Sequence, residues 1–299
     1  MSVPACRYCR QPAVVATVTR DWNRRVSDRA FTLARCTACG LLFLADPPAD
    51  LARYYEGGYH RMPASVEAMD RAPALGAERY KIDLLRRFVA SGDLLEIGPS
   101  IGFFCRLAQR AAFKAHAIEM DAASVDFLRT VLGVETTRSA DPAAALAQMD
   151  RRFDAACLWH SIEHLPEPWR VIEAVARALK PGGVLAIATP NPDAWQAGIM
   201  GARWPHLDQP RHLFLLPRPW LLTLAGKLGL TLELSTTRDA GSLQLNRVGW
   251  AMRVSSAPSS RIARALLYRG ALQLARLAAP WDGREGAGAA YTLVLRKPK

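Results

Sequence analysis

A regular alternation of short apolar runs and amphipathic stretches between residues 91 and 190 constrains the fold more than any other feature. The apolar runs predict buried strands, and the stretches between them carry apolar residues at helical spacing. This order predicts an α/β fold with a parallel sheet and helices on both faces. We expect strands at 94–97, 115–119, 134–137, 154–159 and 184–189, and helices at 102–112, 122–132, 142–149 and 168–179, the last stopped by the Lys-Pro-Gly-Gly of 180–183.

The turn between the first strand and the first helix reads LLEIGPSIGFF, residues 94–104. It lies at the carboxyl edge of the sheet, where folds of this kind bind ligands. Gly98 and Gly102 let the backbone pass close to a ligand, and Glu96 can accept a hydrogen bond from a cationic amine. The alternative is a tight turn without a ligand.

A dinucleotide-binding fingerprint would need glycine at positions 100 and 103, where this chain has Ser100 and Phe103. A cradle for pyrophosphate at this turn is therefore disfavoured. Glu119 ends the second strand, at the place of a carboxylate that accepts both hydroxyls of a ribose. An adenosine-bearing ligand without a diphosphate fits this pair of features best.

Four segments of this region, LLEIGPSIGFF, AIEMD, FDAACLWHSIEHLPEP and ALKPGGVLAIATPNP, resemble successive signature segments of the class I S-adenosylmethionine-dependent methyltransferases. The resemblance covers residues 90–192 and implies a Rossmann-like sheet that binds S-adenosylmethionine. Ser100 departs from the usual glycine and Pro99 from the common cysteine, and we expect tighter backbone geometry there rather than loss of binding. The cofactor-binding residues that the resemblance implies are Glu96, Gly98, Pro99, Ser100, Gly102, Phe103, Glu119, Met120, Ala140, Asp141, Trp159, His160 and Ser161.

Four of the six cysteines form two C-x-x-C pairs near the N-terminus, Cys6 with Cys9 and Cys36 with Cys39. A two-residue spacer lets both thiolates face one centre, and two such turns complete a tetrahedral zinc site with no place left for water. We therefore expect a structural zinc ribbon with a hairpin between its two halves. The alternatives are two disulfides or a single redox pair.

These features predict three regions. Residues 1–48 form the small zinc ribbon, 49–90 a linker and leading helix, and 91–299 the class I methyltransferase domain with a helical insertion at about 241–279. The ribbon and the later segment RWPHLDQPRHLFLLP are similar to bacterial methyltransferases of sugar, glycan and natural-product pathways. The chain is too short for the second Rossmann-like domain that some carbon-methylating members carry.

Methyl transfer from a sulfonium needs a nucleophile aligned with the methyl group, and a hydroxyl or carbon acid also needs a base. His160, Glu163 and His164 follow the fourth strand at the ligand edge, so we expect the catalytic groups among them. A carboxylate beside an imidazole raises its basicity. The alternative for His164 is a hydrogen bond that only fixes the loop.

A second polar group, His206, Arg211 and His212, lies in a proline-rich loop that we expect to cover the acceptor. Arginine there can clamp a phosphate or carboxylate, although a salt bridge within the loop is an equal alternative. Tyr55 and Tyr59 are candidates for the substrate cleft, and packing between regions is the alternative for both. No metal-ligand spacing among these histidines indicates a catalytic metal.

The net charge of +12 divides into +5 for residues 1–90, −3 for 91–202 and +10 for 203–299. Basic flanks favour an anionic small-molecule or glycan acceptor. A non-catalytic cofactor-binding homologue and an RNA methyltransferase are the rival interpretations, the latter disfavoured because no N-P-P-Y type sequence follows the fourth strand. Without a signal peptide or spanning segment we expect a cytoplasmic enzyme, with residues 259–280 as a basic amphipathic contact for the inner membrane surface.

Overall fold

The computed structural model describes residues 4–56, 62–255 and 261–299, with the side chains of all of these except 254, 255 and 261–265. It confirms the predicted α/β architecture. Seven strands form the central sheet in the order β10-β11-β8-β7-β4-β5-β6. β4 to β8 pair in parallel, while β11 is antiparallel to both of its neighbours. The strands are β4 (Gly92–Ile97), β5 (Phe113–Glu119), β6 (Glu135–Arg138), β7 (Phe153–Trp159), β8 (Leu179–Pro190), β10 (Thr231–Thr236) and β11 (Ala290–Arg296).

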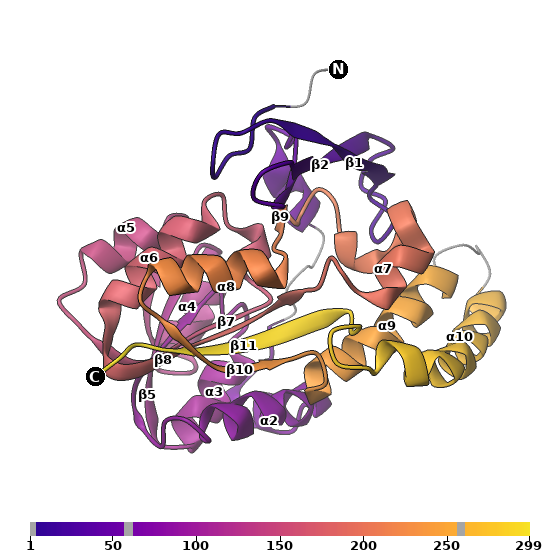
Figure 1. Cartoon of the computed structure of the whole chain (residues 1–299). Helices are drawn as coiled ribbons and strands as arrows, with labels where there is room; N and C mark the ends of the chain where they lie inside the picture. Colours follow the sequence, from indigo (N-terminus) through magenta and orange to yellow (C-terminus); the bar gives the residue numbers. More distant parts are fainter. Residues whose placement is uncertain (1–3, 57–61, 256–260) are drawn as a thin grey trace.

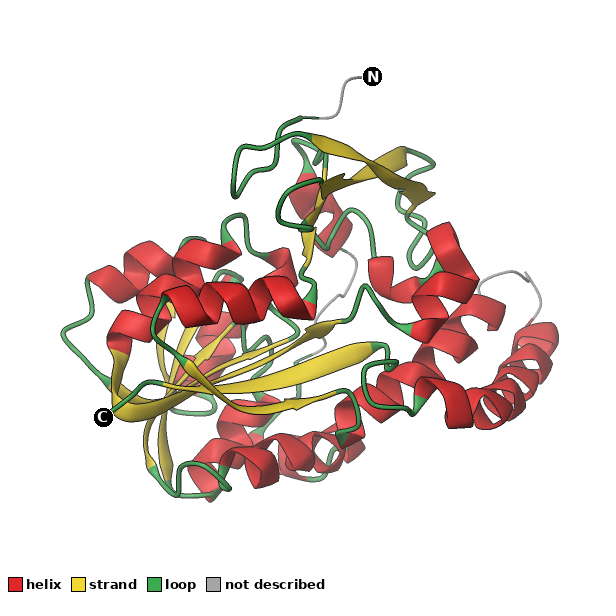
Figure 2. Cartoon of the chain, in the orientation of Figure 1, coloured by secondary structure: helices red, strands yellow, loops and turns green. Residues whose placement is uncertain are grey.

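Helices cover both faces of this sheet (Figure 1; Figure 2). Neighbouring residues of β4 point to opposite faces, because side chains alternate along a strand. Leu94 packs against the helices of one face and Leu95 against those of the other. The first face is covered by α2 (Pro73–Leu85), α3 (Phe103–Arg110) and α4 (Ala122–Thr130), and the second by α5 (Pro142–Ala147), α6 (Pro168–Ala178) and α8 (Arg218–Lys227).

The start of β8 differs from the expected one. The pairing of β7 with β8 jumps from Phe153–Leu179 to Ala155–Val184, so residues 180–183 bulge out of a strand that has already begun. Gly183 allows this because a β-carbon there would lie 2.9 Å from the carbonyl oxygen of Lys180. The Lys-Pro-Gly-Gly sequence therefore does not separate helix from strand.

A smaller antiparallel sheet holds the N-terminal cysteines, in the order β1-β2-β3-β9. Its first two strands are the expected hairpin, and its last strand comes from more than 160 residues further along the chain. That last strand joins the N-terminal region to the segment that directly precedes α8 (Figure 1). The strands are β1 (Ala13–Arg20), β2 (Ala30–Cys36), β3 (Leu42–Leu44) and β9 (Phe214–Leu215).

The insertion is a pair of packed helices, α9 (Ala240–Ser255) and α10 (Arg261–Asp282), beside the short α7 (Trp195–Met200). The ring centres of Trp195 and Trp281 lie 6.0 Å apart with the rings stacked, and this contact holds α7 against α10. The buried Asp282 accepts hydrogen bonds from the indole of Trp250 and the amide of Gln196, both at 2.9 Å. Among the described residues, no helix combines the length and apolar character needed to cross a bilayer.

Candidate functional site

The glycine turn lies between β4 and α3, as expected, and both glycines adopt left-handed backbone angles. Gly98 has φ 71° and Gly102, the N-cap residue directly before α3, has φ 80°. A β-carbon at Gly98 would lie 2.8 Å from Cβ of Ser161, and one at Gly102 would lie 2.5 Å from a methyl group of Leu128. Side chains at either position would therefore push the turn away from its neighbours.

Ser100 sits at the tip of this turn with φ 55°, a conformation that costs a non-glycine residue about 1–2 kcal/mol. The strain orients its backbone N–H, which donates to Oε2 of Glu119 at 3.0 Å. The other oxygen of Glu119 accepts from the N–H groups of Met120 at 2.7 Å and Asp121 at 3.0 Å. One N–H of the turn and two N–H groups that follow β5 thus hold a buried carboxylate in a fixed orientation at the end of β5.

Glu96, the other acid of the motif, is buried under the turn. Burial raises its pKa to about 7, although a hydrogen bond from the thiol of Cys105 at 3.0 Å and the charge of Lys81 act in the opposite direction. Its carboxyl group therefore exchanges a proton near neutral pH. Lys81 itself is buried with its ammonium group 5.5 Å from the ring centre of Trp159.

The segment after β7 contacts the glycine turn directly. The hydroxyl of Ser161 donates to the carbonyl of Ile97 at 2.7 Å, tying the ends of β7 and β4 together. Trp159 is buried, with its ring 5.4 Å from that of Phe104. His160 adopts φ 53° and keeps a partly exposed imidazole at the sheet edge. These three residues thus lie beside the glycine turn at the carboxyl edge of the sheet.

Further along the same edge, Ala140 and Asp141 line an open pocket of about 360 Å³ with Leu165 and Pro166. Asp141 caps α5 by accepting from the N–H of Ala144 at 3.1 Å, so its carboxylate is partly committed to the helix. The side chain of Met120 is 64% exposed, which leaves an apolar surface at the end of β5. Pro99 is buried in the turn and Phe103 is half-buried at the start of α3.

The structure brings together an acid and two histidines from separate segments. Glu163 and His164 lie in the short turn η2 (Ile162–His164), and His212 comes from the loop before β9. One carboxylate oxygen and one ring nitrogen from each histidine lie within 4.8 Å of one another, so the trio can hold a metal ion. The spacing of these residues in the sequence did not indicate such a site. Burial raises the pKa of Glu163, but contacts with the surrounding histidines outweigh it and lower that pKa to about 2.

Backbone carbonyl oxygens hold Nδ1 of both histidines in this trio. Nδ1 of His164 lies 3.0 Å from the carbonyl oxygen of Arg211, and Nδ1 of His212 lies 3.0 Å from that of His206. Because a carbonyl oxygen only accepts, Nδ1 of each ring carries a proton, and in the neutral ring of His164 the lone pair is on Nε2. Burial also lowers the pKa of His164 to about 4, so the ring is neutral at physiological pH.

Arg211 contacts protein carboxylates rather than open solvent. Its fully buried guanidinium donates to Asp21 at 2.6 Å and to Asp208 at 2.8 Å. The alternative of a salt bridge within the loop therefore describes Arg211 better than a clamp for an anionic acceptor. His206 is also buried and hydrogen-bonds to the carbonyl of Leu245 in α9 at 3.0 Å. Both side chains are therefore buried and hydrogen-bonded within the protein rather than facing a site for the methyl acceptor.

Tyr55 lies at the site, because its hydroxyl is 3.0 Å from Nδ1 of His164 and 3.3 Å from the carbonyl of Arg211. Tyr59 falls outside the described residues. The role of Asp21 was missed from the sequence. Its only local sign is a carboxylate directly after a strand, whereas its partner Arg211 is 190 residues away.

The four N-terminal cysteines converge as expected. Sγ of Cys6 lies 3.8 Å from that of Cys39, and Sγ of Cys9 lies 3.4 Å from that of Cys36. A tetrahedral site with Zn–S bonds of about 2.3 Å requires sulfur atoms about 3.8 Å apart. All six cysteines are free thiols, which contradicts the disulfide alternative. The cluster fits a tetrahedral metal ion.

Comparison with known proteins gives separate evidence on the family of this chain. The sequence profile described as "Methyltransferase domain" matches residues 71–235, more than half of the chain. A ubiquinone biosynthesis O-methyltransferase of Xanthomonas oryzae pv. oryzae is 29% identical over 138 residues, covering 44% of this chain and 57% of that protein. The enzyme of the same name from Stutzerimonas stutzeri is 32% identical over 123 residues, covering 39% and 53%. The chain thus spans little more than half the length of these relatives.

Two solved structures share the fold. The cyclase SpnF superposes with a TM-score of 0.51 at 22% identity, covering 76% of this chain and 83% of that one. A SAM-dependent methyltransferase from Archaeoglobus fulgidus gives a TM-score of 0.50 at 16% identity, covering 77% and 97%. At these identities the likeness concerns the fold alone.

Proposed function

This chain belongs to the methyltransferase domain family, and on that premise we propose that it transfers the methyl group of S-adenosylmethionine to a small-molecule acceptor. The observation that carries the proposal is the oriented carboxylate of Glu119 beside the glycine turn. We further propose an acceptor hydroxyl of the sugar, glycan or natural-product type. The sequence relatives are named as O-methyltransferases of ubiquinone biosynthesis, which supports oxygen as the acceptor atom.

The residues at the sheet edge fit the cofactor. Glu119 would accept the ribose hydroxyls with the remaining lone pairs of its oxygens, while backbone N–H groups of Ser100 and Asp121 keep the carboxylate in one orientation. Glu96, once ionised, attracts the cationic amino group, and the exposed Met120 offers an apolar surface to the adenine beside Ala140. When bound, S-adenosylmethionine supplies an electrophilic methyl group on a sulfonium.

In this proposal His164 takes the acceptor's proton. Its Nδ1–H is held by the carbonyl of Arg211, so the lone pair on Nε2 is the basic position. Glu163 lies beside it and accepts from Thr189 at 3.0 Å, which fixes the carboxylate and favours the imidazolium that forms. His160 reaches within 3.7 Å of Glu163 from the cofactor side.

We also propose that the four-cysteine cluster holds one structural zinc ion. The N–H of Cys39 donates to Sγ of Cys36 at 3.3 Å, an interaction that orients a ligand sulfur. Metal analysis of protein purified without chelator should find one zinc per chain, lost in Cys36→Ser. The matched control is Cys105→Ser, a buried cysteine outside the cluster. No zinc in the unchanged protein would refute this part.

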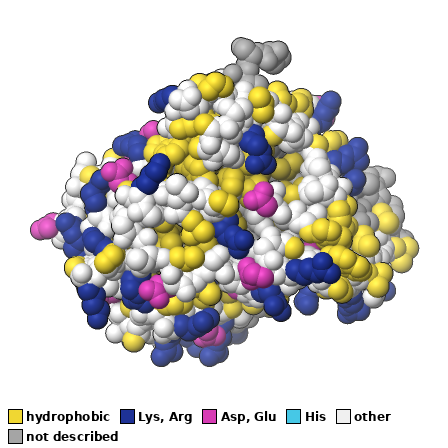
Figure 3. Space-filling model, in the orientation of Figure 1, with side chains coloured by type: hydrophobic (Ala, Val, Ile, Leu, Met, Phe, Trp, Pro, Cys, Tyr) yellow, Lys and Arg dark blue, Asp and Glu magenta, His cyan; other side chains and the backbone are white. Residues whose placement is uncertain are grey.

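A peripheral membrane contact through 259–280 is a further proposal. Residues 259 and 260 lie outside the described part, and so do the side chains up to 265. The exposed apolar side chains of α10 gather on one side of the molecule (Figure 3), with Arg269 and Arg276 exposed on the same helix. The exposed apolar residues of α10 are Leu266, Leu267, Tyr268, Leu274, Leu277 and Trp281. Sedimentation with anionic vesicles at low and high salt tests it, and binding independent of salt or absent would refute it.

The cofactor proposal is tested first on the purified protein itself. Native mass spectrometry should detect carried-over S-adenosylhomocysteine or S-adenosylmethionine, because a charge-assisted contact with the oriented Glu119 carboxylate slows release of the ligand. Protein stripped by refolding should then regain one equivalent of added S-adenosylmethionine. A stripped protein that folds but binds neither compound would contradict the proposal.

A further inference from the structure

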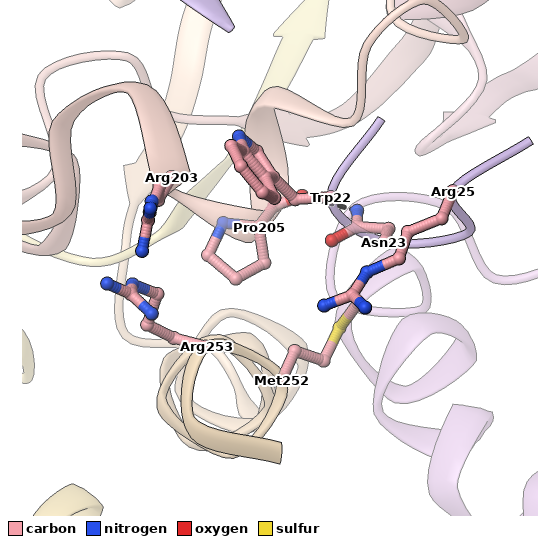
Figure 4. A pocket seen from close by; sticks show the side chains of 7 residues that line it. All are labelled: Trp22, Asn23, Arg25, Arg203, Pro205, Met252 and Arg253. Atoms are coloured by element: carbon pink, nitrogen blue, oxygen red, sulfur yellow. Dashed lines mark hydrogen bonds between the residues drawn. The ribbon is translucent and has the colours of Figure 1, made fainter. Parts of the chain in front are cut away.

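A second pocket lies away from the cofactor edge, where three segments meet. It is open, about 410 Å³ in volume, and lies between the loop after β1, the chain around η3 (Gly201–Arg203) and the end of α9. Figure 4 shows that each of these three segments contributes an arginine side chain to the lining of the pocket. The lining residues are Trp22, Asn23, Arg25, Arg203, Pro205, Met252 and Arg253.

The charge of this lining is one-sided. None of its seven residues, all of which the structure describes, is acidic. The guanidinium of Arg203 lies over the ring of Trp22 at 4.8 Å, which fixes its position at the wall. Guanidinium groups placed around one concave site raise the local positive potential, which attracts an anion.

We propose that this pocket binds a phosphate or pyrophosphate group of the acceptor. Guanidinium groups pair with phosphate oxygens in a bidentate manner, and three of them match a group with two or more negative charges better than a single carboxylate. A concave pocket also fits one small anion better than an extended RNA strand, which needs a charged track. The inference rests on the proposed function, because it defines the chemical class of that enzyme's acceptor.

Hydrogen bonds connect the pocket to the histidine cluster. The amide of Asn23 donates to the carbonyl of Pro205 at 2.7 Å and to Asp208 at 2.5 Å. Asp208 holds Arg211, whose carbonyl oxygen in turn holds Nδ1 of His164. A phosphate bound here would therefore anchor the acceptor on the same loop that orients the proposed base. Binding energy from such a remote group can position the reacting hydroxyl.

The test uses inorganic pyrophosphate as the probe and calorimetry on the full chain. We expect binding that weakens at least tenfold in Arg203→Gln/Arg253→Gln. The matched control removes two exposed, acid-paired arginines elsewhere, Arg79→Gln/Arg177→Gln, and should bind like the unchanged protein. S-adenosylmethionine affinity should be the same in all three proteins, which also reports that the variants are folded.

Two results would overturn the inference. One is pyrophosphate binding that is absent, or equally weakened in both double variants, because the pocket arginines would then have no specific role. The other is a short single-stranded RNA that binds more tightly than pyrophosphate and depends on Arg203 and Arg253. If the unchanged protein does not bind S-adenosylmethionine, the proposed function is refuted instead. Failure of the phosphate-pocket inference and failure of the proposed function are therefore distinguishable.

Discussion

The carbonyl oxygen of Arg211 lies 3.0 Å from Nδ1 of His164, and this contact fixes which nitrogen of the imidazole is basic. The side chain of the same arginine is held by two carboxylates, so a buried ion pair anchors the residue that carries this carbonyl. The proposed base is therefore oriented by a residue 47 positions further along the chain. An oriented neutral imidazole is the arrangement that general-base catalysis requires.

Replacing the proposed base should separate turnover from cofactor binding. We expect His164→Ala to lower turnover by about 10² to 10⁴, the usual contribution of a positioned base, with nearly unchanged affinity for S-adenosylmethionine. Single-turnover kinetics and calorimetry measure the two quantities. His160→Ala and His212→Ala are the comparison variants. If turnover survives in His164→Ala but fails in one of those, the base lies elsewhere in the cluster.

Binding of the cofactor should depend on pH through Glu96. Its pKa is raised from 4.5 to about 7 by burial, so the carboxyl group is protonated in the folded protein below neutral pH. A cationic amine needs the carboxylate, and affinity for S-adenosylmethionine should rise as pH increases from 6 to 8, with release of a proton. Calorimetry in buffers of different ionisation enthalpy measures that proton. Glu96→Gln should remove the dependence, and a pH-independent affinity in the unchanged protein would contradict this role.

The same shift has a consequence for stability with the opposite sign. Between about pH 4.5 and 7 the folded protein binds the proton of Glu96 while the unfolded chain releases it. This residue therefore makes the free energy of unfolding fall as pH rises through that window. Urea denaturation at several pH values should show a smaller decline in Glu96→Gln than in the unchanged protein.

Arg211 should matter for folding before it matters for the acceptor. Arg211→Ala leaves Asp21 and Asp208 without their cation, and breaking a buried pair of this kind costs about 3–5 kcal/mol. The control is Arg177→Ala, which removes an exposed pair with Glu173 and should cost about 1 kcal/mol or less. Urea denaturation measures both. A stable Arg211→Ala with only a raised KM for the acceptor would restore the anion-clamp interpretation.

The sequence predicted the central sheet well because its signals are local. Gly98, Gly102 and Glu119 lie at the ends of strands whose apolar patterns are continuous, and their positions follow from the parallel order. The bulge at 180–183 was missed because proline and glycine are typical both of helix ends and of irregular strands.

The polar cluster was only partly predictable. His164 and His212 were both candidates, but their meeting depends on β9, a strand of only two residues that carries no periodic signal. The pairing of Arg211 with Asp21 joins two loops 190 residues apart, so composition alone could not separate a clamp from a salt bridge. Such contacts are fixed by tertiary packing rather than by local pattern.

The central claim is that the carboxylate of Glu119 binds the ribose of S-adenosylmethionine, and titration calorimetry of one variant tests it most directly. Because Glu119→Ala removes a charged acceptor for two hydroxyls, we predict binding about tenfold to a hundredfold weaker than in the unchanged protein. Glu135→Ala, which removes an exposed acid from the neighbouring strand, should bind normally. Equal affinity in Glu119→Ala and the unchanged protein, or no binding by either, would contradict the account.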